Sequence, residues 1–186
     1  MHQIRLTPIA LIAVAILSLG AVASACGGGD DGGNGGGGGP ELTLEDYFQQ
    51  LGEIDDTFSA EADAIETASG GTAASLEDEE ATLNLLADDL GKQLDLVDAF
   101  ISDVADLNPP AEAQEAHDEA VAAFRELAGL LENVIDEVGN AESMADLEAI
   151  DDTELTAADE RVTEACLAVE QIAADNDIDV DLDCVE

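Results

Sequence analysis

Basic residues are scarce in this sequence. Its 186 residues include 4 Lys and Arg against 45 Asp and Glu, which gives a formal net charge of −41. A nucleic-acid-binding protein neutralises phosphates with Lys and Arg, so this balance excludes that class of function. The same balance argues against docking on an anionic membrane surface through protein side chains.

Aromatic residues are also few. They make up 3% of the chain and Trp is absent, so stacking platforms for sugars or bases are not expected. Hydrophobic residues, mostly Ala, Leu, Val and Ile, nevertheless reach 46%, which is too apolar for a wholly disordered acidic chain. The length corresponds to a single folded domain.

The beginning of the chain has the layout of an export signal. One Arg and no acidic residue lie within residues 1–5, an almost wholly apolar stretch follows over 6–23, and Ala23-Ser24-Ala25 leads to Cys26. A charged start, an apolar middle and a small-residue end are typical of a secretory signal peptide. We therefore predict a signal peptide over residues 1–25.

This stretch resembles the signal of bacterial lipoproteins, in which small residues precede a Cys. The resemblance implies diacylglyceryl transfer to Cys26, cleavage before it and acylation of the new N-terminus. The protein would then be anchored on the extracytoplasmic face of the bacterial cell membrane. Ala23 stands where such signals usually carry Leu, and ordinary signal peptidase also cleaves after Ala-x-Ala. A plain secreted protein and a retained transmembrane anchor therefore remain alternatives.

A glycine-rich tract follows Cys26 and ends at Pro40. Residues 27–39 read GGGDDGGNGGGGG. Such a tract cannot bury apolar surface and behaves as a flexible coil, with an r.m.s. span of roughly 20 Å and a limit near about 45 Å. We interpret residues 26–40 as a lipidated Cys with a tether that lets a folded body stand off a bilayer.

The three cysteines fit this interpretation. Lipidation removes Cys26 from the thiol pool, and the remaining pair, Cys166 and Cys184, can form a disulfide outside the cytoplasm. Two free buried thiols are the alternative. A zinc site is not expected, because the sequence lacks Cys-x-x-Cys spacing with a nearby His.

Residues 41–186 are predicted to form an acidic all-α domain. Apolar residues recur at three- and four-residue steps over 44–68, 76–106, 111–138 and 157–174, and a short helix is expected around Met144, Leu147 and Ile150. Breaks are expected at 69–72, at Asn108-Pro109-Pro110 and at Gly139-Asn140. This pattern predicts an antiparallel up-down bundle of about four long helices plus one short helix. An extended coiled-coil oligomer is the alternative, and the oligomeric state stays open.

Helix starts are suggested by a hydroxyl residue followed three positions later by Asp. In a capping box of this type the hydroxyl accepts a hydrogen bond from an unpaired backbone N–H. The four pairs are Thr43/Asp46, Ser75/Asp78, Ser143/Asp146 and Thr156/Asp159.

The C-terminal tail changes period. Ile178, Val180, Leu182 and Cys184 recur at every second position, which is typical of an extended segment. We expect it to lie along the bundle with its apolar side inward, linked through Cys184 to Cys166. The alternating acids are weak candidates for a calcium site, because carboxylates on one side of a strand lie about 6.5–7 Å apart and the EF-hand Gly and Glu are missing. These acids are Asp175, Asp177, Asp179, Asp181 and Asp183.

His117 is the only imidazole left after removal of the signal peptide. No Gly-x-Ser-x-Gly pattern accompanies it, and Gln114 stands where a di-iron Glu-x-x-His motif needs Glu. We expect a structural His at the start of its helix, half-buried, with a pKa raised by the acidic surroundings. No catalytic residue and no cofactor are predicted.

The body resembles small Ala/Asp-rich helical lipoproteins of bacteria with no assigned activity. The landmarks are Leu107-Asn108-Pro109-Pro110, His117 and the terminal Cys pair, and the resemblance transfers no catalytic residue. The first hypothesis is a lipid-anchored, non-enzymatic binding or spacer module of the cell envelope. The alternative is a solute-binding lipoprotein for a cation or small amine in an inter-helix pocket; a basic protein partner also fits the charge. A hydrolase is a third and more remote hypothesis.

Overall fold

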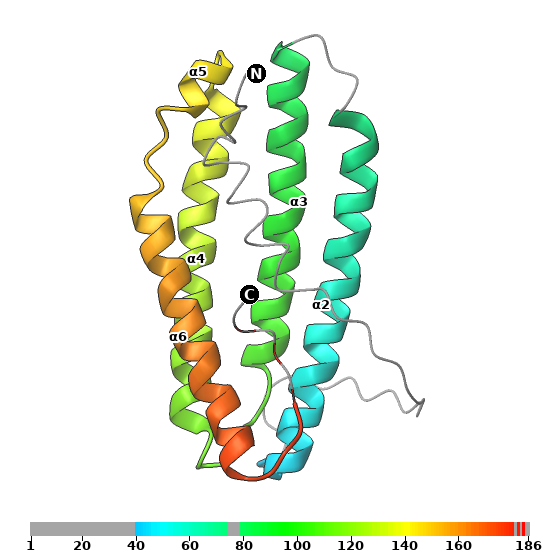
Figure 1. Cartoon of the computed structure of the whole chain (residues 1–186), viewed down its shortest axis with the longest axis vertical. Helices are drawn as coiled ribbons and strands as arrows, with labels where there is room; N and C mark the ends of the chain where they lie inside the picture. The colour runs from blue at the N-terminus through cyan, green and yellow to red at the C-terminus, as the bar shows by residue number, and fades with distance from the viewer. Residues whose placement is uncertain (1–39, 74–78, 181, 183, 185–186) are drawn as a thin grey trace, which may run out of the picture.

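The protein is an antiparallel helical bundle. A computed structural model describes residues 40–73, 79–180, 182 and 184, and within these residues every regular element is helical. The elements are α2 (Leu44–Ala73), α3 (Glu79–Ala105), α4 (Gln114–Asn140), α5 (Met144–Leu147) and α6 (Thr153–Asp175). Four long helices run up and down, α5 caps one end, and residues 176–184 form the C-terminal tail (Figure 1). The predicted fold class is confirmed.

The apolar stripes face inward as the sequence predicted. Tyr47 and Phe48 in α2 and Val138 in α4 are almost completely buried, and the α3 stripe from Leu83 to Val104 lines the core. Burying such a stripe against neighbouring helices is the main source of stability for a helix of this kind. Met144 is the exception, because it is 41% exposed although the sequence placed it inward.

Hydrogen bonds at the helix starts show which of the predicted capping pairs form. The Thr43 hydroxyl oxygen accepts from the Asp46 N–H at 3.1 Å and donates to the Asp46 carboxylate at 2.7 Å, so this capping box opens α2 as predicted. At Ser143 the carboxylate of Asp146 accepts from the Ser143 hydroxyl and from the Glu142 N–H. These bonds lower the pKa of Asp146. The pair Ser75/Asp78 lies outside the described residues.

The prediction for the start of α6 is wrong. This helix begins at Thr153, one turn before the expected start, and the Thr156 N–H already donates to the Asp152 carbonyl inside the helix. Asp151 supplies the local support, because its carboxylate accepts from the N–H and the hydroxyl of Thr153. An acid two residues before a Thr therefore replaces the Thr156/Asp159 box.

Two predicted helix breaks are also wrong. Helix α2 continues through Ser69-Gly70-Gly71-Thr72 to Ala73, and α4 continues through Gly139 and Asn140. At the end of α4 the Asn140 side chain donates a hydrogen bond at 2.6 Å to the carbonyl of Asp136, one turn earlier in the same helix. Gly91 and Gly129 likewise stand inside helices, which shows that glycine alone does not end a helix in this chain.

The proline corner between α3 and α4 is confirmed. Pro109 and Pro110 are buried, and α4 begins at Gln114, three residues later than predicted. The corner is tied to the start of the domain, because the Leu42 N–H donates to the Asn108 carbonyl and the Ala111 N–H donates to the Glu41 carboxylate. The chain thereby brings the beginning of α2, the end of α3 and the beginning of α4 to one end of the bundle.

The core is divided along the bundle. The end that holds the proline corner, called here the tail end, has one cluster to which all four long helices and the tail contribute. Toward α5, the end called here the α5 end, residues of α3, α4, α5 and α6 form a second cluster. Residues of α2, α3 and α4 form a third cluster, which includes Ile101 near the end of α3. Close helix packing follows the pairs α2/α3, α3/α4 and α4/α6. Among the described residues, α2 and α6 do not pack along one another in this way.

Candidate functional site: an internal cavity and the tail that covers it

A cavity of about 70 Å³ lies between the four long helices. Its wall is mainly apolar, and it receives residues from every long helix and from the tail. Its apolar lining includes Leu51 of α2, Val104 of α3, Leu127 of α4, Val169 of α6 and Leu182 of the tail. The up-down arrangement positions them together, because each is on the buried stripe of its own segment.

Aromatic side chains are concentrated at this cavity. The chain contains one Tyr and four Phe residues, and four of these five line the cavity: Tyr47, Phe58, Phe100 and Phe124. The ring centroids of Phe58 and Phe100 are 5.0 Å apart, and those of Phe100 and Phe124 are 5.1 Å apart. Three helices thus bring three rings into one cluster, in which Phe58 is tilted against Phe100 and Phe100 meets Phe124 edge to face, the geometry that the ring quadrupoles favour.

Tyr47 and His117 form a buried polar pair in the cavity wall. The Tyr47 hydroxyl lies 3.3 Å from His117 Nδ1, and the two side chains are 1% and 4% exposed. Burial raises the pKa of Tyr47, so the phenol stays protonated. Burial lowers the pKa of His117, and nearby Asp118 offsets this only in part. The Nδ1 atom of the neutral ring can then accept a hydrogen bond from the Tyr47 hydroxyl.

Two expectations for His117 are therefore corrected. The residue is buried rather than half-buried, and its pKa is lowered rather than raised. The physical reason is that desolvation disfavours the imidazolium more strongly than the surrounding carboxylates favour it. Its partner is the phenol of Tyr47, 70 residues away in sequence.

Carboxylates line the same cavity from the two helices that do not pack together. Asp55 comes from α2 and Asp159 from α6. Asp55 is half-buried and Asp159 is exposed, so both lie toward the outside of the bundle. Burial and then the neighbouring Glu160 raise the pKa of Asp159. The cavity thus combines an apolar interior with negative charge on its α2/α6 side.

The tail covers this side at one end. It turns back from α6 and lies between α6 and α2 at the front of the bundle (Figure 1). Its alternating pattern is confirmed, since Leu182 and Cys184 are buried while Asp177 and Asp179 are exposed. Val180 faces α2 across a glycine: a Cβ atom at Gly52 would lie 3.9 Å from Val180 Cγ2.

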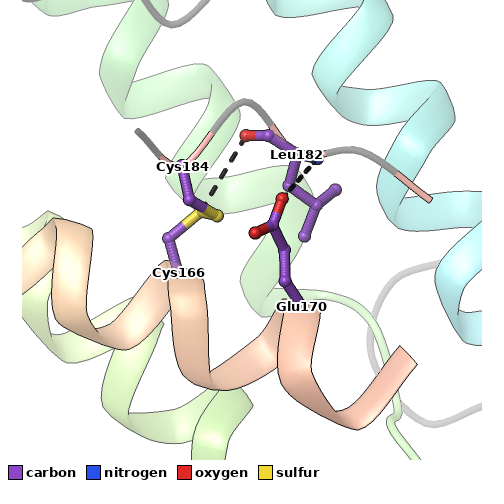
Figure 2. Close-up of a disulfide and its surroundings, with 4 residues drawn as sticks. All are labelled: Cys166, Glu170, Leu182 and Cys184. Atoms are coloured by element: carbon purple, nitrogen blue, oxygen red, sulfur yellow. Dashed lines mark hydrogen bonds between the residues drawn. A yellow bond between two sulfur atoms is a disulfide. The ribbon is translucent and has the colours of Figure 1, made fainter. Parts of the chain in front are cut away.

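A disulfide joins the tail to α6. Cys166 and Cys184 are bonded, with their Cα atoms 5.5 Å apart, and this is the pairing that the sequence predicted (Figure 2). Next to the bridge the Leu182 N–H donates to the Glu170 carboxylate at 3.0 Å (Figure 2). The Leu182 carbonyl oxygen lies 3.9 Å from Cys166 Sγ. These contacts hold Leu182 over the cavity that it lines.

The acidic residues considered for calcium have structural roles where the structure describes them. Asp175 is the last residue of α6, and Asp177 has a φ of 57°, in the left-handed region that ends helices. The Asp177 and Ile178 N–H groups donate to the carbonyls of Ala174 and Ala173, a Schellman arrangement. Asp181 and Asp183 lie outside the described residues. In the part of the chain described, no cluster of three or more His, Cys, Asp or Glu side chains is suited to hold a metal ion.

The cavity carboxylates were missed by sequence reasoning, although a signal exists. Asp55 follows Leu51 by four residues and precedes Phe58 by three, and Asp159 has the same relation to Leu155 and Val162. An acid at the four-three spacing of an apolar stripe lies along the edge of that stripe, within reach of the cavity. The chain has so many acidic residues that the sequence pattern alone does not distinguish Asp55 and Asp159 from acids on the surface.

Cys26 and the predicted signal peptide lie outside the described residues. Across residues 40–73 and 79–180, no helix is both long enough and apolar enough to cross a bilayer. Comparison with protein-family models, with curated proteins and with solved structures gives no match. The fold and the site define the protein as an acidic, disulfide-linked four-helix bundle with an aromatic-lined internal cavity.

Proposed function

We propose that this protein is an exported, lipid-anchored helical bundle that acts by binding rather than by catalysis in the bacterial cell envelope. The disulfide between Cys166 and Cys184 is the observation that carries the proposal. Disulfides persist in oxidising compartments and are rare in the cytosol, so the bridge supports export. It also accounts for two of the three cysteines and leaves Cys26, at the end of the predicted signal peptide, for the lipid.

The sequence around Cys26 supports an anchor with a spacer. The glycine-rich tract after Cys26 is long enough to separate the bundle from a bilayer surface by roughly 20 Å on average. The bundle carries the acidic residues of the chain except Asp30 and Asp31, which favours a body surrounded by water and repelled from anionic headgroups.

Membrane partitioning tests this proposal. The full-length chain is expressed in a bacterial host, and wild type, Cys26→Ser and the matched control Cys184→Ser are separated between a detergent phase and water. We expect wild type and Cys184→Ser in the detergent phase and Cys26→Ser in water. Intact mass should show loss of residues 1–25 together with the added diacylglyceryl and acyl groups.

The two alternatives give different outcomes in the same experiment. A plain secreted protein leaves wild type in water with residues 1–25 removed and no added lipid mass. A retained transmembrane anchor leaves Cys26→Ser in the detergent phase with the signal peptide still attached. Either result contradicts a lipid on Cys26.

A solute-binding role is the second candidate, and the cavity favours it. Apolar, concave sites with a few polar groups are typical of small-molecule binding sites. The interior is apolar with carboxylates toward one side, so a bare cation coordinated at its centre fits poorly and an organic amine fits better. His117 pairs with Tyr47 in the cavity wall, which supports a structural role for the imidazole.

A further inference from the structure

We propose that the cavity binds a compact hydrophobic amine, with its hydrocarbon part against Phe58, Phe100 and Phe124 and its ammonium group beside Asp159. This inference rests on the binding role proposed above and specifies the ligand. It depends on three observations: the lining of the cavity, its volume, and the charge on its α2/α6 side.

The lining selects a hydrocarbon. Apart from the Tyr47–His117 pair and the two carboxylates, the cavity wall consists of aliphatic and aromatic side chains and Cys166. The pair already satisfies its own hydrogen bond, so the interior offers little to a ligand with many polar groups. Burial of apolar ligand surface therefore provides the affinity, at roughly 25 cal/mol for each Å².

The volume limits the ligand to a short chain. The cavity measures about 70 Å³. An engineered protein cavity of about 150 Å³ accepts benzene. This cavity has roughly half that volume and accommodates about three carbons, so the carbon of butylamine that carries the ammonium group lies at the α2/α6 side of the cavity.

The charge selects a cation. Asp55 and Asp159 line the cavity, and the chain as a whole carries a formal charge of −41, so an anionic amphiphile such as a short carboxylate is repelled. A neutral alcohol of the same length gains the hydrophobic contact but not the electrostatic attraction to Asp159.

The arrangement of the helices provides a route to the cavity. The other three helix pairs around the bundle pack closely, whereas α2 and α6, which carry the two carboxylates, do not in the described part of the chain. The tail covers this side near Gly52 and Cys166. Entry between α2 and α6 therefore brings the amine past Asp159 as its chain enters the cavity.

Calorimetric titration of the purified full-length protein tests the proposal. The probes are n-propylamine to n-hexylamine, with 1-butanol and butyrate as neutral and anionic counterparts of butylamine. Saturable binding should be best near butylamine, at least fivefold weaker for butanol, and undetectable for butyrate. Asp159→Asn should weaken butylamine binding at least fivefold, while Asp98→Asn, an exposed acid on α3 outside the cavity, should change it less than twofold.

Binding to the acidic surface is separated from binding in the cavity by a dication. Putrescine binds a dispersed negative surface more tightly than butylamine, whereas the apolar cavity disfavours its second ammonium group. Titration in high salt weakens the surface contribution further, because the Debye length falls to about 3 Å at 1 M. Tighter binding of putrescine than of butylamine under these conditions overturns the proposal.

Enlarging the cavity supplies an independent check. Leu127→Ala should shift the amine that binds most tightly toward hexylamine. If Leu127→Ala does not fold, Val169→Ala removes a smaller side chain from the same cavity wall and tests the same expectation. Equal affinity for butylamine and butanol, or no saturable binding by any amine, overturns the proposal. Neither result affects the partitioning of Cys26→Ser, so failure of the ligand proposal and failure of the anchor remain distinguishable.

Discussion

The tail end and the α5 end of the bundle are closed in different ways. At the tail end, all four long helices share one core cluster with Leu182 and Cys184. At the α5 end, α6 packs with α3, α4 and α5 in a cluster that includes no described residue of α2. Helix α2 packs with α3 and α4 in a separate cluster. A bundle whose first and last helices do not pack closely can still be closed by a covalently held segment of chain.

The reason lies in the order of the chain. Short connections make α3 a neighbour of α4 and bring α6 back along α4, but no connection joins α2 to α6. The tail bridges them at one end only, through Val180 near Gly52 and Cys184 bonded to Cys166. The cavity lies beside this closure, because Leu182 and Cys166 line it, and changes at the two ends should therefore have different effects.

Removing the disulfide should have the largest effect. The double variant Cys166→Ala/Cys184→Ala should lose about 3 kcal/mol of unfolding free energy, because the bridge joins residues 18 apart and restrains the unfolded chain. Denaturant unfolding measures the loss. Hydrogen exchange should accelerate most in the last turns of α6 and the tail; an equal acceleration around α5 would contradict the local role of the bridge.

Two buried valines on α6 allow the same substitution to be compared at the α5 end and in the cavity wall at the tail end. Val162 is in the α5-end cluster and Val169 lines the cavity, and they are 3% and 4% exposed. Val162→Ala should cost about 2 kcal/mol and Val169→Ala about 1 kcal/mol, because a side chain that borders empty space gives up fewer contacts. Chemical denaturation of both variants measures the difference, and a larger cost at Val169 would mean that the cavity is filled in solution.

His117 should make the tail end sensitive to acid. Its folded-state pKa lies below the ordinary value, so its contribution is complete above about pH 6.5 and is lost as the pH falls toward the folded pKa. His117→Gln should cost about 1 kcal/mol at pH 7. The difference between variant and wild type should shrink between pH 7 and pH 5; a difference that widens in acid would indicate a raised pKa.

Replacing Gly52 or Gly91 by Ala should have the smallest effect on the free energy of unfolding, and both substitutions should stabilise the protein. Each stands inside a helix, where Gly→Ala adds about 0.5–1 kcal/mol. A methyl group at Gly52 also makes an ordinary contact with Val180, whereas one at Gly91 meets nothing within 4 Å. Gly52→Ala should therefore raise the melting temperature slightly more than Gly91→Ala, and the excess should vanish in the variant without the disulfide.

The sequence by itself determined the helical bundle and the docking of the tail. Stripes such as Leu83–Val104 and His117–Val138 specify which face of each helix is buried, because helical period is a local property of the chain. The two-residue period of Ile178 to Cys184 likewise predicted which side of the tail faces inward. The Cys166–Cys184 pair followed from cysteine counting. The predicted helix boundaries at Gly139-Asn140 and Thr156 were wrong. The observed boundaries have local side-chain hydrogen bonds, donated by Asn140 and accepted by Asp151, that the apolar period does not record.

Only the tertiary structure decided what the bundle encloses. Tyr47 and His117 are 70 residues apart, and Phe58, Phe100 and Phe124 come from three different helices. Their contact depends on the relative heights and rotations of the helices, which no local period records. The pKa of His117 shows the same limit. The number of acidic residues can be read from the sequence, and it suggests a raised pKa. The burial of the imidazole, which depends on the packed structure, lowers the pKa instead.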